Sequence, residues 1–350
     1  MWAHNMMEYY QNHVKDIQIE IIPYDRRRTK NGLLFRILGG ILDYRKAIIE
    51  TKRKLNNDNY DVLHICTSAS ISLVKDIIVL KVAKKRSVKT AVHLHFGRVP
   101  ELVRKRNWEW RLLKKVIGLA DAVVTMDMKS YEALRGLGYS NIHYLPNPLS
   151  QDIMRQISDE ASSVERDVKK LCFVGHVIPS KGVYEMVEAC KQIDGIKLNV
   201  IGKVAPEVRS RMEEIAGNSD WLTFKGELSH QCVIREMLSS GIFLLPSYTE
   251  GFPNVILESM ACRCAIVATS VGAIPEMLNI SSDLPCGLCS EPKDVDNLHN
   301  NILFFMNHPT EARQFAERAE RRVNDYYAMS IIWKQIHDIW NVLLTQMDNK

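Results

Sequence analysis

The sequence is poor in long hydrophobic runs. Among its 350 residues, no window approaches the ~18 uninterrupted apolar residues that a membrane-spanning helix requires. Residues 1–20 are largely polar and lack the apolar stretch of a secretory signal. The expected location is therefore the cytosol, for a chain whose 46% hydrophobic and 25% charged residues are typical of a soluble globular protein.

The eight cysteines are scattered along the chain. Those inside apolar runs are expected to be small, buried and reduced side chains: Cys66, Cys172, Cys190 and Cys262. The pairs Cys262-x-Cys264 and Cys286-x-x-Cys289 leave a zinc site as an alternative, because zinc ligands use such spacings. Since Cys262 falls in a helix-like run and Cys286 in a short strand and its turn, we expect no metal there.

Charge is unevenly distributed. Residues 1–150 contain 26 Lys and Arg against 14 Asp and Glu, whereas residues 151–350 contain 20 against 27. The first part is therefore strongly basic and the second acidic, although the whole chain has a net charge of only +5. This asymmetry predicts that one domain faces an anionic partner.

The second half alternates short apolar runs with helical patterns. The expected strands are residues 171–177, 197–202, 221–226, 241–246 and 265–269, and the expected helices are residues 181–193, 206–216, 230–238 and 254–262. Continuous apolar strands alternating with helices are typical of a parallel sheet that is covered on both faces.

The first half has the same organisation. Its expected strands are residues 17–22, 62–66, 90–95 and 122–126, and residues 101–119 and 310–347 are expected to be helical. The polar residues 150–169 are interpreted as a linker. We therefore predict an α/β protein with two doubly wound domains, residues 1–150 and 151–330, facing a cleft, and a helix at about 330–350 that packs back on the first domain.

The most informative stretch is residues 245–258, Leu-Pro-Ser-Tyr-Thr-Glu-Gly-Phe-Pro-Asn-Val-Ile-Leu-Glu. A buried strand ends there, a glycine turn follows, and a helix begins near Asn254. The backbone N–H groups of residues 251–254 would then suit an anionic or hydroxyl-rich ligand. Glu250 and Glu258 flank this helix start, so both carboxylates could bind one ligand, and ribose hydroxyls suit such acceptors.

A second strand-to-helix turn is residues 174–182, Val-Gly-His-Val-Ile-Pro-Ser-Lys-Gly. Lys181 stands near the start of a helix, where a lysine and exposed N–H groups can meet a phosphate. In an open α/β sheet, ligands bind beyond the carboxyl ends of the strands. We therefore expect Lys181 and Glu250 at the same edge of one sheet.

Together these stretches resemble glycosyltransferase family 4. The resemblance rests on residues 175–182, on the acidic residues eight apart in 247–258, and on Thr-Ser-Val-Gly-Ala-Ile-Pro-Glu at 269–276. It extends to Ala-Asp-Ala-Val-Val-Thr at 120–125 and Leu-Pro-Asn-Pro at 145–148. The resemblance implies the GT-B architecture of two Rossmann-like domains, and a retaining transfer of sugar from a nucleotide donor.

By this resemblance, residues receive roles in binding the donor. Lys181 is expected to bind the diphosphate and Glu258 the ribose hydroxyls. The donor sugar is expected to contact Glu250 and the backbone of Gly251, Phe252 and Asn254. The turn at Gly175 and His176 is expected beside the diphosphate, and His176 replaces an arginine that the family usually has.

The family also has a histidine at the end of a first-domain strand, which contacts the donor sugar. His93 and His95 are both candidates, because strand alternation puts them on one face. His95 is the preferred residue, since it lies nearer the carboxyl end of its strand. The catalytic residues implied are thus His95, Glu250 and Lys181.

The expected cofactors are none, with the nucleotide sugar as a co-substrate. No Asp-x-Asp metal motif lies at a plausible strand end, and Asp76 and Asp127 are isolated. Without a metal ion, Lys181 and helix-end dipoles would have to stabilise the leaving diphosphate.

Basic clusters in the first domain point to the acceptor: Arg26–Arg28, Lys84–Arg86, Arg104–Arg106, Arg111 and Lys114–Lys115. In the helix expected at residues 101–119, Trp108 should share a side with Leu112 and Val116, whereas Trp110 should lie beside basic residues. A basic helix with an exposed Trp suits an anionic membrane surface. We therefore expect an enzyme bound to the inner face of the plasma membrane that glycosylates a glycan or lipid-linked acceptor in bacterial surface polysaccharide synthesis. Nucleic acid is not an expected partner, since no reading motif accompanies the charge.

One departure from the family lies at the N-terminus. Members begin with an apolar strand and a glycine-rich loop, whereas residues 1–10 read as the helix after that loop and residues 17–22 as the second strand. The pair Gly39-Gly40 lies too late to replace the loop. Two alternatives to a transferase therefore stay open: a nucleotide-sugar epimerase, and a degenerate GT-B partner protein without turnover.

Overall fold

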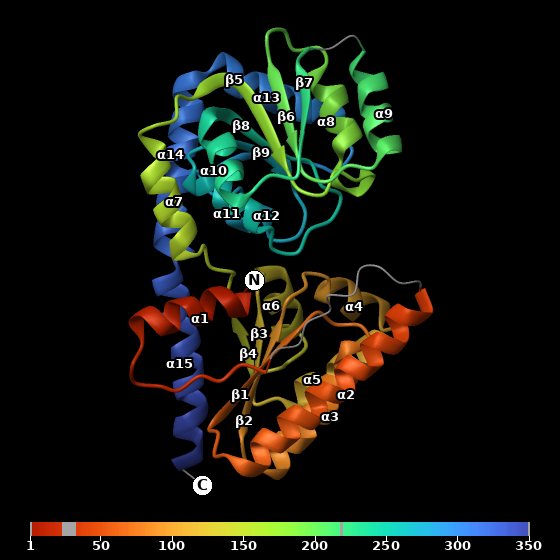
Figure 1. Cartoon of the computed structure of the whole chain (residues 1–350), viewed down its shortest axis with the longest axis vertical. Coiled ribbons are helices and arrows are strands. Elements are labelled where there is room, and N and C mark those ends of the chain that lie inside the picture. The colour runs from red at the N-terminus through yellow and green to blue at the C-terminus, as the bar shows by residue number, and fades with distance from the viewer. Residues whose placement is uncertain (1, 23–32, 218–219, 349–350) are drawn as a thin grey trace. The chain divides into compact units, whose positions relative to one another are not determined.

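The computed structural model describes residues 2–22, 33–217 and 220–348 (Figure 1). The chain forms two compact units: unit 1 is Met1–Pro146 with Trp333–Lys350, and unit 2 is Asn147–Ile332. The division therefore falls at Pro146, and the polar stretch expected to be a linker is structured. It forms helix α7 (Gln151–Ala161), capped by the Ser150 hydroxyl, and the start of strand β5 (Asp167–Val174).

Unit 1 contains a four-stranded parallel sheet in chain order. Its strands are β1 (Val62–Thr67), β2 (Lys89–Leu94), β3 (Ala122–Thr125) and β4 (Ile142–Tyr144). The first three confirm predicted strands. The fourth was not predicted, because its three residues carry too short a pattern and border the Pro146 stop signal.

The predicted strand at residues 17–22 is wrong. The stretch follows helix α1 (Trp2–His13) as irregular backbone. The Tyr10 hydroxyl donates to the Ile17 carbonyl and accepts from the Ile19 N–H, so a side chain takes backbone groups that a neighbouring strand would pair. Residues 39–40 lie inside helix α2 (Leu33–Asn57).

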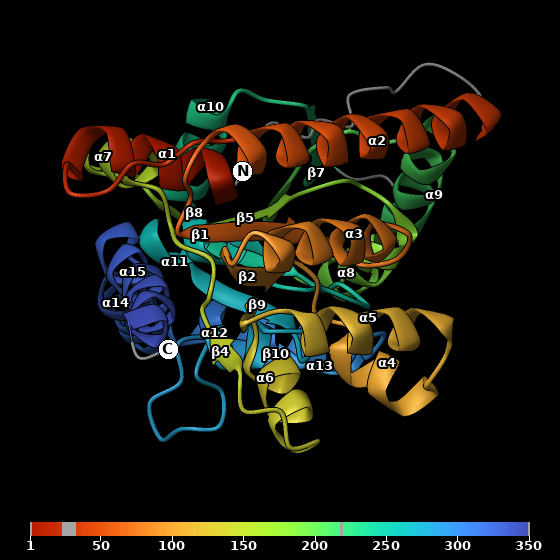
Figure 2. The same cartoon turned by 90° about the horizontal axis from the view of Figure 1, so that it is seen from below.

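One face of the unit 1 sheet is covered by helices α3 (Ser72–Lys85) and α5 (Trp108–Leu119) (Figures 1 and 2). Leu73, Leu80, Val92 and Val123 belong to the aliphatic core of that face. The remaining helices of the first half are α4 (Val99–Lys105) and α6 (Met128–Arg135). The opposite face of β1 and β2 carries histidines instead, because side chains alternate along a strand.

The helix predicted over residues 101–119 is interrupted. Arg106 adopts φ 48°, which ends α4, and the Asn107 side chain accepts from the Trp110 N–H to begin α5. Trp110 is 7% exposed and packs in the core, whereas Trp108 is 54% exposed. The prediction that Trp110 lies among the basic residues is therefore wrong, and Trp108 has that position.

Unit 2 contains a six-stranded, fully parallel sheet in the order β10-β9-β8-β5-β6-β7. The further strands are β6 (Lys197–Ile201), β7 (Leu222–Gly226), β8 (Ser240–Leu245), β9 (Ala265–Thr269) and β10 (Leu288–Ser290). All five residues of β9 are buried, as expected for a strand between two helical layers. Every strand predicted in this half is confirmed.

Helices cover both faces of this sheet (Figures 1 and 2). One layer holds α8 (Val183–Cys190), α9 (Pro206–Ala216) and α13 (Val295–Asn307), and the other holds α7, α10 (His230–Ser239), α11 (Asn254–Ala261) and α14 (Pro309–Tyr326). Two short pieces complete the unit: the 3-10 turn η1 (Pro179–Lys181) and helix α12 (Ile274–Met277). None of the described helices has the length and apolar character to span a membrane.

The predicted helix over residues 310–347 is two helices, α14 and α15 (Met329–Asp348). Between them, the Tyr327 carbonyl accepts from the Leu149 N–H, and Leu149 bridges Ala328 as a strand would. Tyr327 is buried there, so a distant contact rather than a local breaker residue interrupts the helix. From Trp333 onward, α15 packs in unit 1.

The cysteines behave largely as predicted. Cys172, Cys190 and Cys262 are buried, but Cys66 is exposed, because it lies on the histidine face of edge strand β1. All eight thiols are free. A short strand and its turn were predicted at Cys286, and β10 begins just after that residue. Burial raises the pKa of Cys190 to about 12, which keeps that thiol protonated and unreactive.

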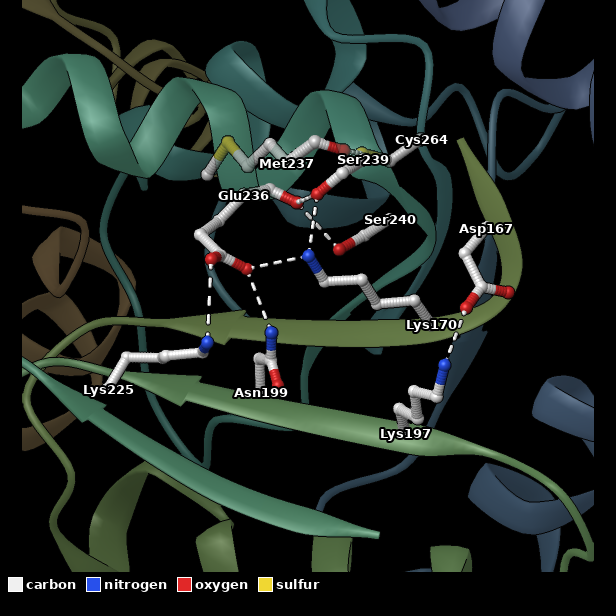
Figure 3. Close-up of polar contacts among 10 residues, drawn as sticks. All are labelled: Asp167, Lys170, Lys197, Asn199, Lys225, Glu236, Met237, Ser239, Ser240 and Cys264. Carbon is white, nitrogen blue, oxygen red and sulfur yellow. Dashed lines mark hydrogen bonds and ion pairs between the residues drawn. The ribbon is translucent and has the colours of Figure 1, made fainter. Parts of the chain in front are cut away.

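Under helix α10, a polar network joins three strands of unit 2 (Figure 3). The Glu236 carboxylate lies 2.8 Å from the Lys170 ammonium and accepts from the Asn199 amide at 2.8 Å. Lys170 also donates to the Ser239 hydroxyl at 2.6 Å. Burial opposes ionisation of Glu236, but these contacts outweigh it and lower its pKa below 4.5. The network therefore fixes α10 to the sheet.

Replacing Glu236 by Gln is expected to lower the free energy of unfolding by about 2 kcal/mol at neutral pH, since Lys170 keeps its charge in a mostly buried place. The folded-state pKa is depressed, so this stabilisation is present above about pH 4.5 and lost as the pH falls through the folded pKa. Urea denaturation against pH measures both effects. The matched control is Asp167→Asn, because the exposed Asp167–Lys197 pair at 3.4 Å should contribute less than about 0.5 kcal/mol. Equal losses in the two variants would contradict the prediction.

Candidate active site

The predicted site residues of unit 2 lie where the strand order reverses. Strands β5, β6 and β7 run outward on one side and β8, β9 and β10 on the other, so β5 and β8 are neighbours at the switch point. Gly175 follows β5 directly, and the stretch that contains Glu250 follows β8. Ligands of doubly wound sheets bind beyond the carboxyl ends of strands at such a point. The topology therefore brings the two predicted turns together.

The two turns are fastened by backbone contacts. The Tyr248 N–H donates to the Ser180 carbonyl at 2.9 Å. Gly182 adopts φ +66°, and a Cβ there would overlap the carbonyl oxygen of Pro246. Glycine is thus required both by backbone conformation and by the close approach of the second turn.

Lys181 and Glu250 form the centre of the site. The Lys181 ammonium lies 2.5 Å from Glu250 Oε1, and the Ser247 hydroxyl donates to the same oxygen at 2.7 Å. The side chains of Lys181 and Glu250 are 26% and 10% exposed, so the pair is shielded but accessible. The predicted proximity of Lys181 and Glu250 is thus present, and Ser247 is a partner that the sequence analysis missed. Its place three residues before Glu250 was the available signal.

A third turn supports this pair from β9. The Thr269 hydroxyl donates to the Ser247 carbonyl at 2.5 Å, and the Ala273 N–H donates to the Gly251 carbonyl at 2.9 Å. Gly272 has φ +55°, and a Cβ there would overlap the carbonyl oxygen of Glu250. Residues 269–276, which carry part of the family resemblance, therefore position the Glu250 turn.

Helix α11 begins at Asn254, as predicted, after Pro253. Pro253, the residue before the helix, provides no side-chain cap. The Asn254 side chain accepts from the Asn147 amide at 3.1 Å. The Phe252 ring is buried and meets Tyr327 edge-on at 5.9 Å, and a backbone contact of Phe252 with the donor stays a prediction.

Glu258 lies in the second turn of α11 and has a different neighbour. Its carboxylate is 3.4 Å from His230 Nε2, at the start of α10, whose N-cap is Ser229 as predicted. The hydrogen bond to Glu258 raises the pKa of His230 above 6.5, and burial opposes it. Glu250 and Glu258 share no contact among the described residues. His230 was not predicted, since nothing in its sequence spacing relates it to Glu258.

A raised pKa in the folded state means that the His230–Glu258 contact stabilises the fold below about pH 6.5 and ceases to do so as the pH rises through the raised pKa. We expect an NMR titration to give His230 a pKa above 6.5, and Glu258→Gln to return it toward that value. The Lys191→Ala variant, on the far helix α8, serves as the control and should leave the titration unchanged. An unaltered His230 pKa in Glu258→Gln would contradict the assignment.

Other predicted residues have clear positions. His176 is exposed just beyond β5. In unit 1, His93 is fully buried and His95, at the end of β2, is half-buried, with 4.1 Å between their ring centroids. The two histidines therefore share one face, as predicted. Asp294, which was not among the predicted residues and belongs to the pair Asp294-x-Asp296, caps α13 by accepting from the Asn297 N–H.

Part of unit 2 is similar to a described family of proteins. Residues 154–322 match the family described as glycosyl transferases group 1. The group 1 match contains Lys181, Glu250 and Glu258. CapM of Staphylococcus aureus, a capsular polysaccharide biosynthesis glycosyltransferase, is 22% identical over 244 residues, which are 66% of this chain and 61% of CapM. The chain thus spans less than two thirds of that relative, and the group 1 match itself falls within unit 2.

Solved structures show the fold. Sucrose-phosphate synthase from Thermosynechococcus elongatus superposes with a TM-score of 0.71 at 18% identity, over 87% of this chain and 79% of the synthase. HepE of Anabaena, solved in complex with UDP, gives 0.68 at 16% identity, over 87% of this chain and 83% of HepE. The chain therefore has the GT-B fold of two Rossmann-like units, as predicted, and its unit 2 carries the group 1 match.

Proposed function

We propose that the chain is a retaining, metal-independent glycosyltransferase that moves a sugar from a nucleoside diphosphate sugar to a glycan or lipid-linked acceptor in surface polysaccharide synthesis. One observation carries the proposal: Lys181, Glu250 and Ser247 meet at the switch point of the unit 2 sheet, beside the uncapped start of α11. The group 1 match and the likeness to CapM support it. HepE, solved with UDP, supports a nucleotide ligand.

The proposed chemistry follows from the charges. An incoming diphosphate would compete with Glu250 for Lys181, so Lys181 would neutralise the charge that develops on the leaving phosphate. Glu250, released from this pair, would accept hydrogen bonds from the donor sugar, together with the backbone of Gly251 and Asn254. Glu258 is the proposed acceptor for ribose hydroxyls, and His95, in unit 1, is proposed to contact a sugar.

Activity assays with UDP-, GDP- and ADP-sugars and a lipid-linked glycan extract test this function. We expect release of nucleoside diphosphate coupled to a glycosylated product whose anomeric configuration is that of the donor. Addition of EDTA should leave the rate unchanged, and Glu258→Gln should raise KM for the donor. Epimerised donor without transfer would instead identify an epimerase, and absence of any turnover of the nucleotide sugars would indicate a degenerate partner protein.

We also propose an anionic membrane surface as a partner of unit 1. The exposed face of α5 presents Trp108, Arg111 and Lys115 at helical spacing. Helix α3, which packs beside α5, exposes a stripe of Ile71, Val74, Ile78, Lys81 and Lys85. The predicted cluster Arg26–Arg28 lies outside the described residues.

Sedimentation with phosphatidylglycerol vesicles is expected to show binding that weakens with salt, since each basic residue near the surface contributes about 1 kcal/mol. Replacing Lys114 and Lys115 by Glu should reduce the bound fraction by about tenfold or more. Replacing Lys191 and Lys203, two exposed lysines of unit 2, serves as the matched control. Binding that is equal for neutral and anionic vesicles would remove this proposal and leave the transferase activity untouched.

A further inference from the structure

The face of the unit 1 sheet that lies opposite the aliphatic core carries a cluster of five aromatic rings, here called the histidine box: Trp2, His64, His93, His95 and Trp340. His64 comes from β1, and His93 and His95 come from β2 and its end. Trp340, on α15, donates from its indole N–H to His64 Nδ1 at 3.2 Å. The box therefore joins four segments that are distant in sequence.

Most polar atoms of the histidine box have no partner. Both ring nitrogens of His93 are buried without a hydrogen bond, as are Nε2 of His64, Nε2 of His95 and the indole nitrogen of Trp2. Each buried and unsatisfied group costs about 1–3 kcal/mol, and native proteins contain only a few per ~100 residues. Packing of apolar side chains accounts for the opposite, aliphatic face of the sheet, but it does not account for five unsatisfied polar atoms in one place. Such a concentration of unpaired donors and acceptors indicates a ligand site.

The charge state of the box restricts the ligand. Burial lowers the pKa of His64 to about 3 and of His95 to about 4, and lowers that of His93 well below 6.5. At neutral pH each imidazole is therefore uncharged and presents one donor and one acceptor. Uncharged rings bring no positive charge to pair with a phosphate or a carboxylate. Alternating donors and acceptors between aromatic faces instead match the hydroxyl groups and C–H faces of a sugar ring.

Trp2 occupies the middle of the box. Its ring is stacked on His64 at 5.2 Å and 13°, stands edge-on to His93 at 4.8 Å and lies 5.5 Å from His95. It belongs to α1, which rests on Trp333 of α15 through Tyr9 and Tyr10, at 5.5 Å and 6.3 Å. The indole thus covers all three imidazoles without satisfying their nitrogens.

We propose that Trp2 fills a binding site for a neutral sugar ring, and that it must leave the histidine box before the ring can hydrogen-bond to His64, His93 and His95. This inference rests on the proposed transferase function and states the chemical class that unit 1 binds. The ring comes either from the acceptor glycan or from the donor. Trp2 then acts as a plug that lowers the apparent affinity by the fraction of molecules in which it is displaced.

Saccharide titrations of the full chain with isotope-labelled histidine test the plug. Methyl α-D-glucopyranoside and methyl N-acetyl-β-D-glucosaminide are the probes, and the side-chain NMR signals of His64, His93 and His95 are the readout. We expect saturable shifts of these signals in the wild type, and a dissociation constant about tenfold lower in Trp2→Ala, because the plug is gone. Trp2→Phe, which keeps a ring in the box, should fall between them.

The matched control is Trp108→Ala, which also removes one tryptophan from unit 1 but lies on the exposed face of α5. It should titrate as the wild type does, and His143 of β4 should not shift in any variant. Absence of histidine shifts in both wild type and Trp2→Ala with every saccharide probe, UDP-glucose included, or equal affinity in these two variants, would overturn the inference.

Two further experiments distinguish the acceptor from the donor as the source of the sugar ring, and separate this inference from the proposed function. Shifts of the box with a methyl glycoside alone assign the site to the acceptor, whereas shifts with UDP-glucose but not with a methyl glycoside assign it to the donor sugar. UDP alone and inorganic phosphate should not shift the box. If UDP binds the chain while no saccharide reaches the box, the inference fails and the proposed function survives. If no nucleotide binds, the proposed function fails by itself.

Discussion

Replacing Lys181 by Ala is expected to lower kcat/KM for the nucleotide sugar by about 10²–10³-fold, the effect of removing one preorganised group that stabilises a developing negative charge. Its ammonium stands 2.5 Å from Glu250 in a mostly shielded place, so water replaces it poorly. The fold should survive, because Glu250 keeps its hydrogen bond from Ser247. Steady-state release of nucleoside diphosphate, with the melting temperature as a check, measures both effects.

The matched control for Lys181 is Lys191→Ala. Lys191 also pairs with a glutamate, Glu188 at 2.6 Å, but on the exposed surface of α8. Its removal should leave kcat/KM unchanged within about twofold and stability within about 0.5 kcal/mol. A Lys181→Ala enzyme with near-normal kcat/KM would show that the diphosphate lies elsewhere, and the proposed role of the whole turn would then be lost.

Replacing Gly182 by Ala is expected to reduce the free energy of unfolding by about 3 kcal/mol and to abolish donor binding. The residue has φ +66°, and its Cβ would overlap the Pro246 carbonyl, which is backbone and cannot rotate away. The β5 and β8 turns would have to separate, which would move Lys181 away from Glu250. Urea denaturation and calorimetric titration with UDP measure the two losses.

Gly226 provides a closely matched control. It has φ +67°, almost the same backbone conformation, but an added Cβ would meet nothing within 4 Å. Gly226→Ala should therefore cost only the strain of the left-handed conformation, about 1 kcal/mol, and should leave UDP binding intact. Equal losses in Gly182→Ala and Gly226→Ala would show that strain rather than the contact between turns matters at Gly182.

The sequence by itself determined the local elements of unit 2. Each strand there is a short apolar run bounded by glycine or a polar turn, and Ser229 and Pro206 mark helix starts by their own chemistry. The start of α11 at Asn254 was also predicted correctly, because a glycine turn and Pro253 precede it in the chain. These features depend on neighbouring residues and could be read directly. That Glu250 and Glu258 bind one ligand stays a prediction, since they have different neighbours, Lys181 and His230.

The tertiary structure decided which distant groups meet. The order of β5 beside β8 brings Lys181 to Glu250 across 69 residues, and no periodicity encodes that order. Likewise, Tyr10 takes the backbone of residues 17–19 away from a strand, and Leu149 pairs with Tyr327 to divide the last helix. Trp108 and Trp110 exchange their expected positions because Asn107 starts a new helix. In each case a long-range contact or cap outweighs a weak local preference, whose energy is a few tenths of a kcal/mol per residue.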